Sequence, residues 1–280
     1  MRVAIVFFLL LSLTSCSSKL AYDNLDWWVY WYLDDYVELN DEQEDKFDDY
    51  LNNWLQWHKR SELKRYESQL KTLKQQVLNS ELDYDTVYAH INDVRTHWER
   101  VRAEISPQLA ELAVDLTDQQ IVSLFATLEK DNKEEEKERK EFLKQSDKER
   151  SEERIERMVD NVEERIGDLS DEQKQIIATY NAQFVSTSDE WLQYRRNIQN
   201  AARRLFITKS TNPNFIQDLT YLMQNPDKYR SEDYQQASAH NMKVVATLMV
   251  EIASTLSESQ RKTLVENIDE FITTVDRFQK

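Results

Sequence analysis

Apolar residues recur at three- and four-residue steps along several segments of the chain, the spacing of one helix face. Near the C-terminus this stripe comprises Leu264, Ile268, Phe271, Ile272 and Val275. Together with the start and stop signals described below, the pattern predicts helices near residues 22–36, 41–58, 61–79, 84–104, 107–115, 118–145, 147–166, 171–208, 213–224, 231–254 and 258–278.

Residues 1–15, MRVAIVFFLLLSLTS, follow a different pattern. Arg2 precedes a nearly unbroken apolar run from Val3 to Leu13. A run of roughly eleven residues is typical of the core of a secretory signal peptide and is too short to span a ~30 Å hydrocarbon layer. The alternative is an N-terminal strand or core helix. We expect a signal peptide over residues 1–15.

A five-residue pattern, L-[S/T/N]-x-x-Q, marks four predicted helix starts, at Leu39, Leu116, Leu169 and Leu256. In this pattern the Ser, Thr or Asn side chain caps the N3 amide, and the Gln side chain bonds back to the cap amide. The preceding leucine can pack on an apolar residue of the first turn, such as Ile121. The intervals of 77, 53 and 87 residues are irregular, which argues against a solenoid repeat.

Other residues predict further helix ends. Proline after Ser106 and after Asn212 is typical of the first position of a helix, and Gly167 favours a left-handed helix terminus. Ser146 and Glu149 form another capping box, which divides a long charged stretch.

Composition decides the fold class. The 280 residues include one glycine and three prolines, too few for the turns that a sheet needs. We therefore predict an all-α protein: an elongated multi-helix bundle of about ten helices with no sheet. No long flexible linker interrupts the predicted helices, so residues 22–280 are expected to form a single domain.

The charge of the chain restricts its partners. The formal charge of −16 becomes −17 when residues 1–15, with one basic and no acidic residue, are removed. This balance argues against nucleic acid as a partner. Residues 129–157 hold 12 acidic and 10 basic residues, several at i,i+4 spacing. They predict a solvated, projecting helical pair near 118–166; the alternative is a docking arm for an envelope partner.

The residues that could carry chemistry are few. The four histidines, His58, His90, His97 and His240, form no E-x-x-H or H-E-x-x-H motif. His90 and His97 lie seven residues apart on one helix face. A single glycine excludes a glycine-rich phosphate loop and a G-x-S-x-G motif. We expect no catalytic residue, no metal and no cofactor, and therefore no enzyme.

An aromatic run near the N-terminus contains Trp27, Trp28 and Trp31. Trp and Tyr favour the membrane–water interface, so these tryptophans are candidates for contact with a membrane or a partner. The alternative is packing in the core. Asp26, Asp34 and Asp35 flank the run and would be repelled by anionic lipid.

Leu13-Thr14-Ser15-Cys16 resembles the lipobox of bacterial lipoproteins. The resemblance implies cleavage between Ser15 and Cys16, with covalent lipid (diacylglycerol and palmitate) on Cys16 and a tether over residues 16–21. Cys16 is the only cysteine; a free thiol or an intermolecular disulfide is the alternative. Ser17, where sorting to the inner membrane would use Asp, resembles an outer-membrane signal and implies a periplasm-facing, outer-membrane-anchored protein of a Gram-negative bacterium.

Two family resemblances extend further along the chain. The segments 20–27, 33–37 and 57–63 resemble an uncharacterised proteobacterial lipoprotein family, classed as a domain of unknown function. Leu116-Thr117-Asp118-Gln119-Gln120 is similar to the L-T-x-x-Q motif of Spy- and CpxP-type periplasmic proteins, which are shorter and have a basic client surface.

These expectations favour a membrane-anchored helical scaffold or protein-interaction module with an envelope protein partner. The alternative is a tethered periplasmic chaperone or envelope-stress sensor of the Spy and CpxP type.

Overall fold

The computed structural model describes residues 25–279, and within that range every regular element is helical, which confirms the all-α prediction. The signal peptide, the Ser15–Cys16 cleavage site and the tether lie outside the described residues. In chain order the helices are α3 (Leu25–Asp34), α4 (Asp41–Trp57), the π-helical segment η1 (His58–Glu62), α5 (Leu63–Asn79), α6 (Tyr84–Asp115), α7 (Asp118–Phe142), α8 (Asp147–Ile166), α9 (Asp171–Asn181), α10 (Ser188–Ile207), α11 (Phe215–Gln224), the 3-10 segment η2 (Pro226–Tyr229), α12 (Glu232–Ser254) and α13 (Glu258–Phe278).

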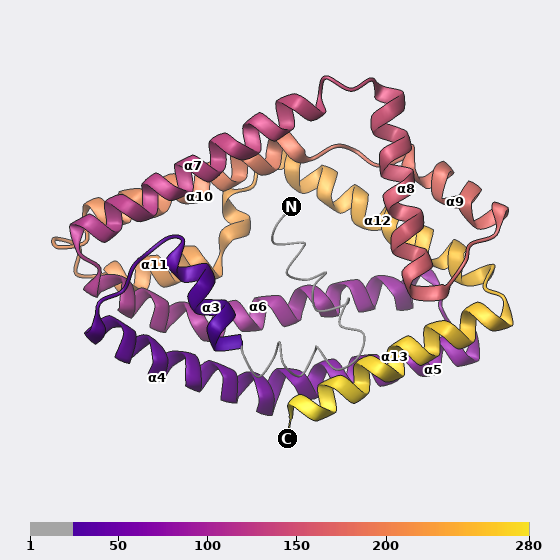
Figure 1. Cartoon of the computed structure of the whole chain (residues 1–280), viewed down its shortest axis with the longest axis horizontal. Helices are drawn as coiled ribbons and strands as arrows, with labels where there is room; N and C mark the ends of the chain where they lie inside the picture. Colours follow the sequence, from indigo (N-terminus) through magenta and orange to yellow (C-terminus); the bar gives the residue numbers. More distant parts are fainter. Residues whose placement is uncertain (1–24, 280) are drawn as a thin grey trace.

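The helices form an elongated bundle (Figure 1). α4, η1 and α5 follow one another along one side, and α6 runs beside them. The most extensive contacts join α6 to α11 and α5 to α13; α7 lies along α10, and α12 crosses between α6 and α9. No residue of the described range forms a strand, so the whole bundle is held by helix-to-helix packing.

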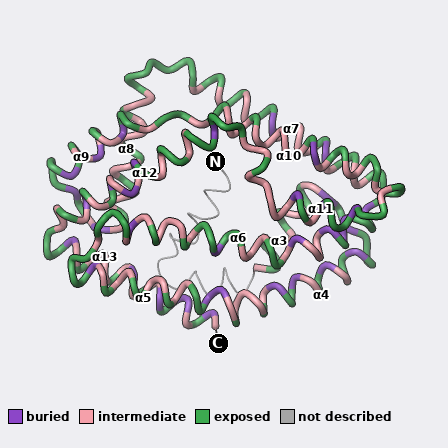
Figure 2. Tube along the Cα trace, turned by 180° about the vertical axis from the view of Figure 1, so that it is seen from behind, coloured by how far each residue is buried: buried purple, intermediate pink, exposed green. Residues whose placement is uncertain are grey.

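The core is divided into clusters along the body rather than gathered at one centre (Figure 2). The cluster at one end is built on Phe47, Leu51 and Trp54 of α4 with Leu112 and Leu116. The cluster at the other end joins α8, α9 and α12, and its members are Ile166, Leu169, Ile177, Leu248 and Ile252. The predicted stripe of α13 is confirmed, since Ile268, Ile272 and Val275 are buried.

The four L-[S/T/N]-x-x-Q segments all form capping boxes, as predicted. They also meet in pairs. The side-chain amides of Gln43 and Gln120 bond reciprocally at 3.1 and 2.7 Å, and those of Gln173 and Gln260 at 3.0 and 2.8 Å. The first pair joins the N-termini of α4 and α7, and the second those of α9 and α13, at opposite ends of the long axis (Figure 1).

Each pair also binds the backbone that enters the opposite helix. Gln43 donates to the carbonyl of Asp115 at 2.8 Å, and Gln120 to that of Glu38 at 2.6 Å. At the other end Gln260 donates to the carbonyl of Asp168 at 2.8 Å. A local capping motif therefore serves as a tertiary tie that closes both ends of the body.

The predicted helix break before Pro107 is wrong, because α6 continues through it to Asp115. Proline has no N–H, so the carbonyl four residues earlier loses its helical donor. That carbonyl belongs to Ala103, and Gln224 of α11 donates to it at 3.2 Å. A side chain 121 residues away thus replaces the missing helical hydrogen bond.

Other boundaries also differ from the predictions. The single helix expected over 171–208 is broken between Asn181 and Ser188, where Asn241 bonds both the N–H and the carbonyl of Val185. The helix expected at 213 begins at Phe215. Instead of a break between 58 and 61, the chain stays helical through η1.

The charged segment near 118–166 forms the two helices expected, α7 and α8, with the predicted capping box at Ser146. α7 lies along α10 rather than standing away from it. Arg196 of α10 pairs with Glu129 at 2.9 Å and with Glu136 at 2.6 Å, and Arg139 pairs with Asp189 at 3.1 Å. The most exposed part is residues 143–149, the turn between the helices and the start of α8.

Candidate functional site

Helix α3 carries the largest exposed aromatic side chains near the N-terminus of the described chain. We call Trp27, Trp28, Trp31 and Tyr32 the α3 aromatic surface; their exposed fractions are 58%, 50%, 54% and 58%. Adjacent rings touch edge to face, with centroids 4.9 Å apart for Trp27–Trp28 and 5.9 Å for Trp28–Trp31. The core-packing alternative is therefore wrong for these three tryptophans, which form one continuous exposed patch.

The opposite face of α3 fixes the helix to the body. Val29, Tyr30 and Leu33 pack against the α4–α6 core cluster. The Tyr30 ring meets Phe47 edge to face at 5.3 Å, and its hydroxyl donates to Asp48 at 2.6 Å. Burial, reinforced by the Asp48 carboxylate, raises the pKa of Tyr30 far above its ordinary value, so the hydroxyl stays a donor.

A second tyrosine ties the end of α3 to a different helix. The hydroxyl of Tyr36 donates to Asp131 of α7 at 2.7 Å. Arg195 of α10 reaches the same carboxylate oxygen at 3.5 Å. Because both tyrosines hold α3, the aromatic surface is presented on a fixed helix and not on a loose terminus.

The charges on α3 restrict what this surface can bind. Its sequence, LDWWVYWYLD, contains two aspartates and no basic residue. Asp35 follows directly. An anionic surface would meet three carboxylates and no cation on this segment, whereas a neutral or zwitterionic surface would meet mainly indole and phenol rings.

A buried polar network joins η1, α5 and α6. Glu62, the last residue of η1, is 0% exposed. One of its oxygens accepts from Arg100 Nε at 2.7 Å, and the other lies 2.9 Å from His97 Nδ1. Gln69 bridges the two α6 histidines: its Oε1 lies 2.9 Å from His97 Nε2, and its Nε2 donates to the carbonyl of His90 at 3.0 Å.

Both ring nitrogens of His97 have polar partners. Nε2 faces the side-chain oxygen of Gln69 at 2.9 Å, and Nδ1 lies 2.9 Å from Glu62 Oε2 and 2.5 Å from Arg100 Nη2. Burial lowers the pKa of His97, against the opposing effect of Glu62, and burial also lowers the pKa of nearby His58 to about 4. Glu62, held by Arg100 and His97, has a pKa below its ordinary value despite its burial.

This network is built to hold helices together. Both oxygens of Glu62 are occupied and the carboxylate is fully covered, so no substrate reaches it. A π-helical turn often accompanies functional sites, but this one serves to place Glu62 inside the bundle. The sequence placed His90 and His97 on one helix face but did not reveal the carboxylate beside His97, because Glu62 comes from another helix.

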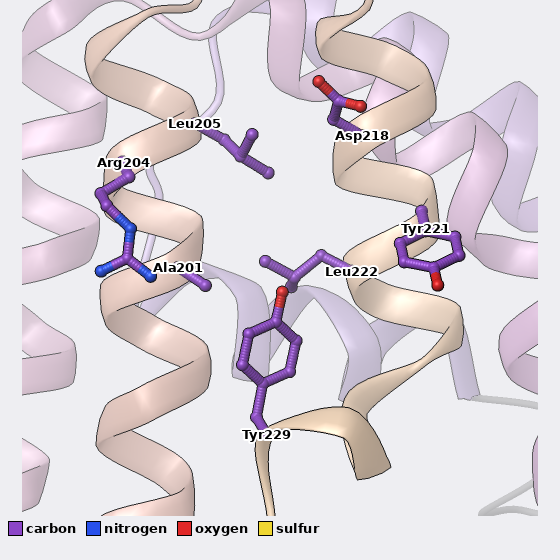
Figure 3. A pocket seen from close by; sticks show the side chains of 7 residues that line it. All are labelled: Ala201, Arg204, Leu205, Asp218, Tyr221, Leu222 and Tyr229. Atoms are coloured by element: carbon purple, nitrogen blue, oxygen red, sulfur yellow. The ribbon is translucent and has the colours of Figure 1, made fainter.

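A hollow of about 280 Å³ opens between α10, α11 and η2 (Figure 3). Its charged groups are Arg204 of α10 and Asp218 of α11, and Tyr221 is half exposed at its edge. Lys228 lies 4.4 Å from the centre of the Tyr221 ring. The complete lining is Ala201, Arg204, Leu205, Asp218, Tyr221, Leu222 and Tyr229.

Residues 25–279 contain no grouping of three His, Cys, Asp or Glu side chains that could hold a metal ion. No helix of the same range is long and apolar enough to cross a membrane. The strongest candidate site in the described chain is therefore the α3 aromatic surface.

Comparison with known sequences identifies a family. Residues 35–235, more than half of the chain, match the family described as "Family of unknown function (DUF6279)". The chain belongs to the DUF6279 family. The DUF6279 match contains Gln43, Gln120, Gln173 and the Glu62 network, whereas α3 and α13 lie outside it. No curated protein and no solved structure matches the chain.

Proposed function

We propose that this DUF6279 protein is a lipid-anchored protein of the bacterial envelope whose helical body is an interaction scaffold. It is processed between Ser15 and Cys16, carries lipid on Cys16 and faces the periplasm from the outer membrane. The observation that carries the proposal is the α3 aromatic surface, whose helix begins at Leu25, nine residues along the chain from Cys16.

Exposed tryptophans are costly unless something covers them. Trp and Tyr are enriched at interaction surfaces because one end of the side chain is apolar and the other can form hydrogen bonds. Scattered single apolar residues are ordinary on protein surfaces, but a contiguous aromatic patch on a fixed helix favours a contact site. Edge-to-face contacts between the three indoles make the α3 aromatic surface one such patch.

The chaperone and stress-sensor function receives less support. It rested on the L-T-x-x-Q motif, and here Gln120 of that motif is occupied by Gln43 and by the carbonyl of Glu38. A motif used for internal ties does not by itself provide a client surface. The acidic balance of the chain also differs from the basic client surface implied by that resemblance.

The anchor has a direct test. Cys16→Ala should abolish metabolic labelling with palmitate and leave the precursor uncleaved, since the acceptor thiol and the cleavage site are lost together. Ser17→Ala is the matched control and should be labelled like the wild type. Equal labelling of the Cys16→Ala protein would show that lipid is not attached there.

The interaction surface is tested by photo-crosslinking in cells. A photoreactive phenylalanine derivative at Trp31 should trap a discrete envelope component. The control position is Trp98 of α6, which is similarly exposed at 48%. The same products from both positions, or none from position 31, would remove the support for α3 as a contact site.

A further inference from the structure

We propose that the α3 aromatic surface lies in the headgroup layer of the membrane that anchors Cys16, and that it prefers zwitterionic lipid. This inference rests on the proposed lipid anchor. It assigns the partner of the contact site as lipid, and it makes α3 a second attachment point for the body.

The covalent length of the chain brings α3 close to the anchor. Nine Cα–Cα steps separate Cys16 from Leu25. At no more than ~3.6 Å for each step, the two residues lie within about 32 Å whatever the path of the chain between them. Trp27 and Trp31 are within two turns of Leu25 on the same helix. A membrane that holds Cys16 is therefore within reach of the tryptophans.

The chemistry of the exposed side chains fits a membrane interface. Indole and phenol rings favour the headgroup level, where the ring contacts the upper acyl chains and the N–H or O–H remains in the polar layer. The α3 aromatic surface is already in place, because Tyr30 and Tyr36 hold this segment through Asp48 and Asp131. Contact with the membrane then requires no ordering of α3, which lowers the entropic cost of binding.

Anchoring makes a modest affinity sufficient. Once Cys16 is in the bilayer, contact by α3 is an intramolecular event with an effective concentration in the millimolar range for a short link. Three half-exposed tryptophans and one tyrosine are suited to such a weak second contact. They would be a weak anchor by themselves.

The charge pattern selects the lipid. Polybasic segments bind anionic leaflets, and α3 has no basic residue. Asp26, Asp34 and Asp35 would be repelled by an anionic surface over a Debye length of about 10 Å at 0.1 M salt. A zwitterionic headgroup layer presents no such net charge.

The test couples the chain from Cys16 to Lys280 to vesicles through its only thiol. Cys16 is joined to a maleimide-bearing lipid in phosphatidylcholine vesicles, with or without bromine atoms near the top of the acyl chains. Bromine quenches tryptophans that lie in the bilayer surface. We expect clear quenching of the wild-type emission, and at least a threefold smaller quenched intensity in the Trp27→Phe/Trp28→Phe/Trp31→Phe protein. Trp98→Phe is the matched control and should retain the wild-type quenching.

The necessity of the contact is tested with Trp27→Ser/Trp31→Ser, in which Trp28 remains as a reporter. Its quenching should fall, while the thermal midpoint of the exposed-site variant stays within about 2 °C of wild type. Replacing one third of the lipid by phosphatidylglycerol should weaken the wild-type quenching at low salt, and added salt should restore it. Stronger quenching with the anionic lipid would overturn the lipid preference.

Three results would overturn the membrane contact itself. The first is the absence of bromine-dependent quenching, and the second is quenching that survives in the triple phenylalanine protein. The third is an emission change that depends on protein density and not on bromine, which would assign the surface to a second copy of this chain. Because the chemical coupling replaces cellular lipidation, these results are separate from the palmitate labelling. Palmitate labelling can be absent in cells while tryptophan quenching is present on vesicles, and labelling can be present while quenching is absent.

Discussion

Gln173→Ala tests whether the paired glutamines tie the ends of the bundle. Gln173 is 0% exposed. Its Oε1 accepts from the N–H of Ser170 at 3.0 Å and from Gln260 at 2.8 Å, and its Nε2 donates to Gln260 at 3.0 Å and to the Thr255 hydroxyl at 3.2 Å. Truncation leaves these buried groups without their partner and opens a cavity.

The expected loss of stability follows from those groups. A buried polar group left without a partner costs about 1–3 kcal/mol, and loss of a helix cap costs about 1 kcal/mol. Allowing for overlap between the two, we expect the free energy of unfolding to fall by about 3–5 kcal/mol. The measurement is urea unfolding at pH 7, followed by circular dichroism at 222 nm.

The control is Gln175→Ala, two residues along α9 on its exposed face, which should change the free energy by no more than about 0.5 kcal/mol. A double-mutant cycle with Gln260→Ala isolates the tie itself, and the coupling energy should exceed about 1 kcal/mol. A loss below about 1 kcal/mol for Gln173→Ala, or additive losses in the cycle, would refute the tie.

Three further predictions concern the interior. Glu62→Gln should lower the free energy of unfolding by about 2–4 kcal/mol, because Arg100 loses its buried counter-charge; a urea midpoint equal to wild type would contradict this. Burial lowers the pKa of His58 from 6.5 to about 4, so as the pH falls the unfolded chain binds a proton at this residue before the folded chain does. The contribution of His58 to the free energy of unfolding is therefore complete above pH 6.5 and falls by up to about 3 kcal/mol towards pH 4. Urea midpoints across that range should fall further in the wild type than in His58→Gln, which keeps the contribution of His97; equal falls in the two proteins would contradict this. Gln224→Leu should cost about 1 kcal/mol in the wild type and less in a Pro107→Ala background, where position 107 regains its N–H; equal costs in the two backgrounds would exclude the bond to Ala103 as the cause.

Local signals in the sequence predicted the helix starts well, because a capping box involves residues only three apart. The same signals did not reveal which boxes pair. Gln43 and Gln120 are 77 residues apart, and their amides meet only because α4 and α7 begin at the same end of the bundle. The pairing of two capping boxes is a property of the tertiary arrangement. A motif whose local role is the helix cap can therefore also join two helices.

The helix boundaries that were predicted wrongly also depend on residues distant in the sequence. A proline inside a helix is unfavourable when its orphaned carbonyl has no donor, and sequence reasoning assumed none at Ala103. Gln224 provides that donor from α11. Conversely, the break that Asn241 of α12 stabilises at Val185 was missed, although the Ser and Thr residues at 186–188 are typical of a loop or a helix start. Both outcomes depend on partners distant in the sequence.

The α3 tryptophans illustrate a different limit. Aromatic side chains fit a core and an interface equally well, so their spacing left both alternatives open. In the structure Val29, Tyr30 and Leu33 face the core cluster, and the hydroxyls of Tyr30 and Tyr36 bond Asp48 and Asp131. The face of α3 that is buried thus depends on contacts with helices distant in the sequence.

That arrangement constrains how the α3 aromatic surface works. Rotating α3 to bury its tryptophans would break the Tyr30–Asp48 hydrogen bond and separate Tyr30 from Phe47, so the exposed state belongs to the folded ground state. Whatever covers the surface must then come to it. If the chain is held at Cys16 as proposed, a second contact at α3 would limit the rotation of the body about its anchor. Since Tyr30 and Tyr36 tie this segment to α4 and α7, the limit would apply to the bundle as a whole.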